Sequence, residues 1–162
     1  IMGKYNNKIM AEFNPPRKWV LGRDLSYTTN EINEEEIKVL KRIGVRLKYN
    51  PNDTVSIIVR KGFVTDLASA PRALWVLIAP FDIARAAIIH DLLYKNIRQY
   101  RWVKKEKQDK DLVNQAKVTA DKIFMLAMND ASPKVPQWKI YSSWKAVDLF
   151  GYSSIVPNED NI

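Results

Sequence analysis

Short runs of aliphatic and β-branched residues, separated by polar residues, dominate the N-terminal part of the chain after residue 18. Three of them have the length and partial alternation of β-strands: residues 19–21, 45–49 and 54–59. Between the last two, the tripeptide Pro-Asn-Asp at residues 51–53 predicts a hairpin turn. We therefore expect a small antiparallel sheet in this half of the protein.

A helix is predicted between the first two of these strands, in the stretch that begins at Asn30. Glutamates occupy positions 34–36, basic residues follow at Lys38, Lys41 and Arg42, and Gly44 comes next. Acidic residues at the start of a helix and basic residues at its end interact favourably with the helix dipole, and glycine commonly follows the last turn.

From Ser69 onward the apolar residues recur at helical spacing. Ser69 and Pro71 predict a short helix that extends to about Ile78 and is broken by Pro80. Three longer helices follow in the prediction: residues 82 to at least 97 with Asp82 as the cap, about 111–128, and about 136–150 with Gly151 as the stop. The predicted fold class is α+β, with a small antiparallel sheet in the N-terminal half followed by a helical half of three to four helices.

The sequence predicts a single domain over residues 1–162, because no internal repeat, low-complexity segment or long linker divides it. We expect residues 1–16 to form an extended N-terminal arm and residues 152–162 a flexible tail. The polar, lysine-bearing residues 1–13 predict no secretory leader. No apolar run approaches the ~20 residues of a membrane helix, so no transmembrane segment is expected.

Composition excludes several chemistries. The chain has no cysteine and one histidine, so it has no disulfide, no thiolate nucleophile and no metal site built on two histidines. Hydrophobic residues at 46% and charged residues at 27% are typical of a globular protein rather than a disordered one.

The formal net charge of +8 is concentrated in one stretch. Residues 95–117 contain eight basic and three acidic side chains, with Tyr100 and Trp102 among them. Basic side chains attract phosphates and aromatic rings stack on bases, so this stretch is a candidate site for DNA or another polyanion. The residues assigned to that site are Arg101, Lys104, Lys105 and Lys107. The alternative is a solvated loop between two helices, because charges of both signs are mixed there.

The single histidine is the first candidate for catalysis. In a helix His90 and Tyr94 lie one turn apart on the same face, and Asp91 points about 100° away from them. Burial next to a carboxylate keeps the pKa of a histidine near neutrality, as a general base requires. The alternatives are a hydrogen-bonded core histidine and, for Asp91, a surface carboxylate paired with Lys95.

Two further aspartates extend this set. Asp121 lies on a half-apolar stripe of the helix at about 111–128. If that helix packs antiparallel to the one that carries His90, Asp121 orients the imidazole through its second nitrogen, as the third group of a triad does. The alternative for Asp121 is a salt bridge to Lys117 or Lys122. Asp66 is a further oxygen ligand or, alternatively, a turn or cap carboxylate.

Three motifs resemble a family of uncharacterised proteins of tailed bacteriophages and prophages: GFVTDLASAP at residues 62–71, AIIHDLLY at 87–94 and ADKIFMLAM at 120–128. The resemblance covers roughly residues 45–151. It implies a phage protein made for the virion, such as a tail or connector component. It also implies other virion proteins as partners, and a location in the virion or the host cytoplasm.

The sequence His90-Asp91-x-x-Tyr94, followed by Asp121 and Phe124, is similar to the secreted phospholipases and to the cysteine-free phospholipase module of parvovirus capsids. In those enzymes the histidine activates a water, the adjacent aspartate holds calcium, and the later aspartate and the tyrosine support the histidine. The resemblance implies catalytic roles for His90, Asp121 and Tyr94 and calcium binding by Asp91. This chain lacks the glycine-rich calcium loop of those enzymes, and Asp66 is the substitute ligand.

Three interpretations stay open at this point. The first is a hydrolase in which His90 is the base. The second is a virion component without enzymatic activity, in which the histidine, aspartate and tyrosine form a buried hydrogen-bond network that pairs two helices. The third is a regulatory protein that acts on a host factor. The sequence alone does not decide whether the protein is an enzyme.

Overall fold

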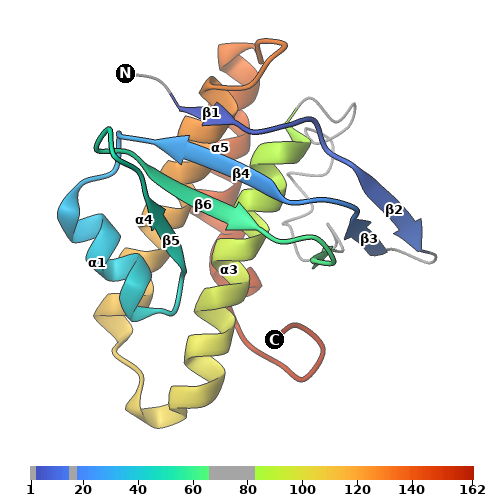
Figure 1. Ribbon diagram of the computed structural model, residues 1–162. Helices are drawn as coiled ribbons and strands as arrows, with labels where there is room; N and C mark the ends of the chain where they lie inside the picture. Colours follow the sequence, from blue (N-terminus) through green and yellow to red (C-terminus); the bar gives the residue numbers. More distant parts are fainter. Residues whose placement is uncertain (1–2, 15–17, 66–82) are drawn as a thin grey trace.

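The computed structural model describes residues 3–14, 18–65 and 83–162 (Figure 1). It has the predicted α+β class, with antiparallel sheets in the N-terminal half followed by helices. The predicted short helix from Ser69 to Ile78, its stop at Pro80, the cap at Asp82 and the candidate ligand Asp66 lie outside the described residues.

The strands form two antiparallel sheets rather than one. The four-stranded sheet contains, in spatial order, β1 (Lys4–Tyr5), β4 (Leu25–Thr29), β6 (Val55–Val59) and β5 (Leu47–Tyr49). The three-stranded sheet contains β2 (Ala11–Asn14), β3 (Lys18–Leu21) and β7 (Val64–Thr65). The three predicted strands are β3, β5 and β6, and β5 and β6 pair antiparallel on either side of the predicted turn.

Two of the helices begin with a side-chain cap that the sequence prediction did not name. They are α1 (Glu34–Arg42), α3 (Ala84–Lys104), the short 3-10 helix η2 (Lys105–Lys107), α4 (Lys110–Asn129) and α5 (Gln137–Ser154). The Asn33 side chain accepts a hydrogen bond at the start of α1, and the Asp109 side chain accepts one at the start of α4. These bonds satisfy amide groups that have no partner within the helix.

The helices form successive layers on the larger sheet. The sheet contacts α3 through β4 and β6, α3 packs against α4, and α4 also contacts α5 and α1 (Figure 1). Fully buried side chains from each of these layers, including Tyr27, Ile57, Ile89 and Phe124, form one core. Because only the short helix η2 and two further residues join α3 to α4, these two helices run in opposite directions.

Gly151 does not end the last helix, as the sequence predicted. Helix α5 continues to Ser154, and Gly151 is buried inside it. A Cβ at this position would lie 2.3 Å from Tyr94 Oη and 3.2 Å from Lys117 Cε. The glycine therefore permits close packing of α5 rather than a helix stop.

The basic stretch is less of a loop than its composition suggested. Most of residues 95–117 is helical, because α3 extends to Lys104, η2 follows it and α4 begins at Lys110. Lys105 takes a positive φ of 50°, which turns the chain at this point.

Both segments that were predicted to extend from the domain make specific contacts. In the N-terminal segment, β1 pairs with β4 and β2 pairs with β3. The C-terminal segment begins with the last turn of α5, and the carbonyl oxygen of Asn161 accepts a hydrogen bond of 2.7 Å from Arg98 Nε.

Candidate functional site

The helical hairpin of α3 and α4 brings the predicted catalytic residues together. His90 and Tyr94 lie one turn apart on α3, and Asp121 faces them from α4. His90 Nε2 is 2.8 Å from Asp121 Oδ1, and Tyr94 Oη donates a 2.7 Å hydrogen bond to the same oxygen. The prediction that His90 and Asp121 lie within hydrogen-bond reach across two antiparallel helices is confirmed.

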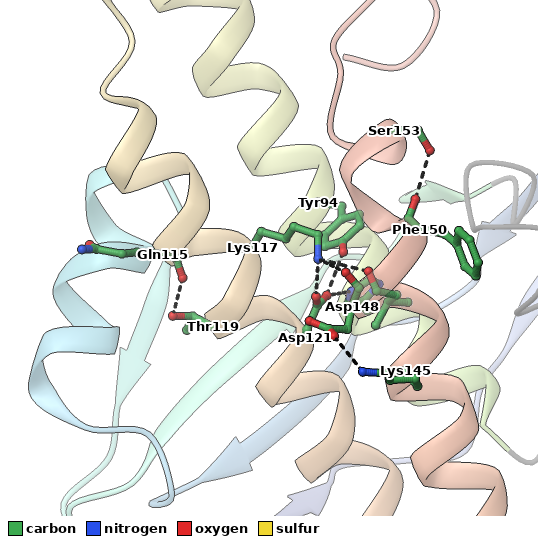
Figure 2. A network of polar contacts seen from close by, with 11 residues as sticks. Tyr94, Gln115, Lys117, Thr119, Asp121, Lys145, Asp148, Phe150 and Ser153 are labelled. Atoms are coloured by element: carbon green, nitrogen blue, oxygen red, sulfur yellow. Dashed lines mark hydrogen bonds and ion pairs between the residues drawn. The ribbon is translucent and has the colours of Figure 1, made fainter.

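Lys117 joins these residues and was not predicted as a member of the site. Its Nζ donates to Asp121 Oδ2 at 2.8 Å and to the carbonyl oxygens of Val147 at 3.0 Å and Asp148 at 3.3 Å (Figure 2). It also lies 4.2 Å from the centre of the Tyr152 ring. The i,i+4 spacing of Lys117 and Asp121 is the only sequence signal, and it indicated a salt bridge as the alternative role of Asp121. We call the four residues His90, Tyr94, Lys117 and Asp121 the Asp121 network.

All four residues of the Asp121 network are buried, with exposed fractions between 1% and 5%. Burial alone would raise the pKa of the Asp121 carboxyl, but hydrogen bonds from His90, Lys117 and Tyr94, together with nearby positive charge, outweigh it and hold that pKa below its usual range. Burial, reinforced by the negative charge of Asp121, raises the pKa of Tyr94 far above its usual range. Asp121 is therefore ionised at neutral pH, and Tyr94 keeps the proton that it donates.

These contacts determine which imidazole nitrogen faces Asp121 with a proton. An ionised carboxylate accepts hydrogen bonds only, so Nε2 of His90 carries a proton, and in the corresponding neutral tautomer the free electron pair is on Nδ1. The rings of Tyr94 and Phe124 pack against the imidazole, with ring centres at 4.0 and 4.8 Å from its centre. No described residue hydrogen-bonds to Nδ1, and among the described residues Ser143 Oγ is the one buried side-chain polar atom without a partner.

Asp91 lies on the neighbouring stripe of α3 and has different partners from those that the sequence suggested. Thr65 Oγ1 donates a 2.6 Å hydrogen bond to Asp91 Oδ2, and Arg98 Nη2 lies 3.9 Å from Oδ1. Lys95, the alternative partner, instead lies over the Phe63 ring at 5.4 Å. Within the described part of the chain, no group of three or more His, Cys, Asp or Glu side chains could hold a metal ion. Calcium binding by Asp91 and Asp66 stays a prediction, since Asp66 lies outside that part.

The predicted polyanion site divides into two kinds of residue. Lys104, Lys105 and Lys107 are exposed. Arg101 is half-buried, and it donates to Gln108 Oε1 at 3.0 Å and to the carbonyl oxygen of Ile155 at 2.8 Å. Two of its donors are therefore used within the protein.

Comparison with known families places these residues in a wider group. The sequence matches the family DUF1353, described as a protein of unknown function, over residues 42–147. The chain belongs to the DUF1353 family. The matched region contains all of the Asp121 network, Asp91 and the basic stretch. Comparisons with curated proteins and with solved structures found no match. No helix within residues 3–14, 18–65 and 83–162 is long and apolar enough to cross a membrane.

Proposed function

We propose that this DUF1353 chain is a bacteriophage virion protein with a hydrolase site, in which His90 is the general base. The observation that carries the proposal is the hydrogen bond between His90 Nε2 and the ionised Asp121, which leaves the electron pair of Nδ1 available. The motifs that resemble tailed-phage proteins support the virion origin, in a tail or connector.

The chemistry follows from the fixed imidazole. Nδ1 of His90 takes a proton from a water molecule while the water oxygen attacks the electrophilic atom of the substrate, and the imidazolium then returns the proton to the leaving group. Asp121 stabilises the imidazolium through Nε2, as the buried aspartate of a triad does. Tyr94 and Lys117 hold the Asp121 carboxylate in place.

The likeness to phospholipases supports the same assignment of roles. In those enzymes the later aspartate and the tyrosine support the histidine, and here Asp121 accepts hydrogen bonds from both His90 and Tyr94. Calcium binding by Asp91 is part of this proposal and can be tested by adding a chelator. Arg98 already places a positive charge near this carboxylate, so we expect hydrolysis to persist when calcium is removed by a chelator.

A second function is a virion component without enzymatic activity, in which the Asp121 network joins helices. The observation that favours it is Lys117, whose ammonium group links Asp121 on α4 to two carbonyl oxygens on α5. With His90 and Tyr94 on α3, the network connects three helices, and the charges of Lys117 and Asp121 cancel. In this case the exposed lysines beyond α3 would face DNA or an acidic neighbour.

The variant His90→Ala separates the two functions. In both cases it leaves Asp121 with one partner fewer and costs about 1–3 kcal/mol of unfolding free energy. In the hydrolase it also abolishes hydrolysis, whereas the structural component has no hydrolysis to lose. Hydrolysis would be measured on phospholipid esters, peptides and phosphodiesters, with Asn114→Ala, an exposed position of α4, as the control. A large loss of stability together with no hydrolysis by the unmodified protein decides against the hydrolase.

A second experiment uses the fact that the chain has one histidine. Nitrogen NMR of the imidazole would show a protonated Nε2 and an unprotonated Nδ1 at neutral pH. Diethyl pyrocarbonate acylates an unprotonated, reachable imidazole nitrogen, so the hydrolase proposal expects modification of His90 in the folded protein, located by peptide mapping. Modification that occurs only after unfolding would show that Nδ1 is sealed and would contradict the general-base role.

A further inference from the structure

A pocket of about 440 Å³ lies on the other side of α3 from the Asp121 network. Its described lining comes from the β1–β2 connection, the three-stranded sheet, the first two turns of α3 and the α4–α5 connection. The apolar part of this lining consists of Ile9, Ala11, Trp19, Ala84, Ile88 and Pro133. The volume falls in the range of about 300–1,000 Å³ that is usual for small-molecule sites.

The geometry of α3 separates this pocket from His90. Successive residues of a helix are turned by about 100°, so Ile88 and His90 point roughly 200° apart. His90 contacts α4, whereas Ile88 lines the pocket. The described lining of the pocket therefore lies on a different face of α3 from His90, and its Thr65 donates a hydrogen bond to Asp91.

The charged side chains in the described lining of the pocket are all basic. Arg85 and Lys8 line it, and no acidic side chain is among the described lining residues. Arg85 is held in place by hydrogen bonds to the carbonyl oxygens of Ser132 at 2.8 Å and Asn7 at 3.4 Å, and it lies 4.4 Å from the centre of the Tyr5 ring. These partners are uncharged, and no described carboxylate lies within ion-pair distance of either cation. Within the described part of the chain, neither cation therefore has a carboxylate as its partner.

We propose that this pocket binds a small amphiphile, namely an organic monoanion with an apolar alkyl body. The apolar walls contact the alkyl body, the Trp19 ring packs on it, and Arg85 and Lys8 bind the anionic head. A water molecule takes about 30 Å³ of liquid, so the pocket has room for a molecule on the order of a dozen non-hydrogen atoms. Decanoate has this size and charge and is the probe of choice.

The test compares decanoate with decanol, which has the same chain and no charge. Binding to the full chain would be measured by calorimetry, and its position by the indole N–H signal of Trp19, assigned with Trp19→Phe. We expect decanoate to shift this signal and to bind at least about tenfold more tightly than decanol, since an ionised hydrogen-bond acceptor interacts more strongly with Arg than a neutral one. Salt should weaken decanoate binding and leave decanol binding unchanged.

Variants at the two cations complete the test. Arg85→Gln should weaken decanoate binding about tenfold, and Arg85→Lys should recover part of this loss. Lys8→Gln, at an exposed position, should leave the fold intact and weaken binding about two- to fivefold, as loss of an exposed ion pair does. Lys48→Gln, on the edge strand β5, removes the same charge outside the pocket and should have no effect.

The proposal is overturned if decanoate does not bind, if decanoate and decanol bind with equal affinity, or if binding leaves the Trp19 signal unchanged. If Arg85→Gln fails to fold, Lys8→Gln and the salt series still decide. Equal decanoate affinities of the Lys8→Gln, Lys48→Gln and unmodified proteins, without salt dependence, would exclude an anion-binding role.

Discussion

The hairpin of α3 and α4 places lysine side chains in two opposite environments. In the middle of α4, the Asp121 network buries the ammonium group of Lys117 with 1% exposure and pairs it with a carboxylate and two carbonyl oxygens. At the end of α3 and in the short helix η2 that follows it, Lys104, Lys105 and Lys107 are exposed to solvent. The first region satisfies its charge inside the protein, and the second leaves its charge to water or to a partner.

The difference shows where stability and binding depend on charge. A buried charge is costly unless it is paired, so removing one partner in the network penalises the others. An exposed lysine is solvated with or without a partner, so its removal changes stability little. Substitutions in the network should therefore act on the fold, and substitutions in the connection should act on association with other molecules.

The largest effect is expected from Asp121→Ala. This change leaves the ammonium group of Lys117 buried without its carboxylate, and it should lower the unfolding free energy by about 3–5 kcal/mol, measured by urea denaturation. The second substitution Lys117→Met, made in the same chain, removes the unpaired charge and should recover part of the loss. Equal stabilities of the single and double variants would show that Lys117 is not the source of the penalty.

Gly151→Ala should have the next largest effect. In a helix without neighbours, alanine is more favourable than glycine by about 1 kcal/mol. At this position the new Cβ would lie 2.3 Å from Tyr94 Oη, so either α5 or the tyrosine must move. We expect a net loss of about 1–3 kcal/mol, typical of overpacking. Ser153→Ala, exposed on the same helix, is the control, and a stabilised Gly151→Ala protein would show that α5 can shift without cost.

The pH dependence of stability should report the ionisation of Asp121. Its pKa in the folded protein lies below the usual value of 3.8, so its contribution is fully present above that value and is lost as the pH falls through the folded pKa. In Asp121→Asn the fall of unfolding free energy below about pH 4 should be less steep, as measured by urea titrations at several pH values. Asp24 and Asp109 also have lowered pKa values but are unchanged by this substitution, so the comparison isolates Asp121. Identical slopes would mean that the partners of Asp121 do not lower its pKa in the folded protein.

The sequence predicts those features of the fold and of the Asp121 network that depend on local patterns of residues. Strand β6 and the four described helices follow from β-branched content, apolar spacing and charge order. The pairing of His90 with Asp121 was predictable because both residues lie on apolar stripes of consecutive helices with a short connection. Strands β1 and β7 have two residues each, too few for any period to emerge.

The missed features depend on contacts between distant elements. Lys117 has the sequence of a surface lysine, and its burial results from carbonyl oxygens of α5 that lie 30 and 31 positions away. Gly151 has the pattern of a helix stop, but its role is set by Tyr94 on another helix. In β4, Thr29 is polar and yet fully buried, which obscures the alternation with Leu25 and Tyr27. None of these positions is determined by its neighbours in sequence.

The exposed connection should give the smallest change in stability and the clearest change in binding. Replacing Lys104, Lys105 and Lys107 by Gln should alter the unfolding free energy by no more than about 0.5 kcal/mol, because exposed lysines have no fixed partner to lose. If this segment contacts DNA, the same triple variant should bind more weakly. The slope of log K against log salt should then decrease in magnitude by about 0.9 for each phosphate that the variant no longer binds.

The control for the connection is a triple variant of exposed lysines elsewhere, Lys4, Lys48 and Lys61 to Gln, which lowers the net charge equally. Equal effects of the two triple variants would mean that only net charge matters, and salt-independent binding by the unmodified protein would leave the lysines as a solvated surface. Unfolding of the variant at Lys104, Lys105 and Lys107 would show that these lysines stabilise the fold, as Lys117 does in the Asp121 network. It would then contradict the distinction between a buried charge that supports the fold and exposed charges that act on a partner. Since no described carboxylate lies within ion-pair distance of these three lysines, we expect their charge to act only on a partner.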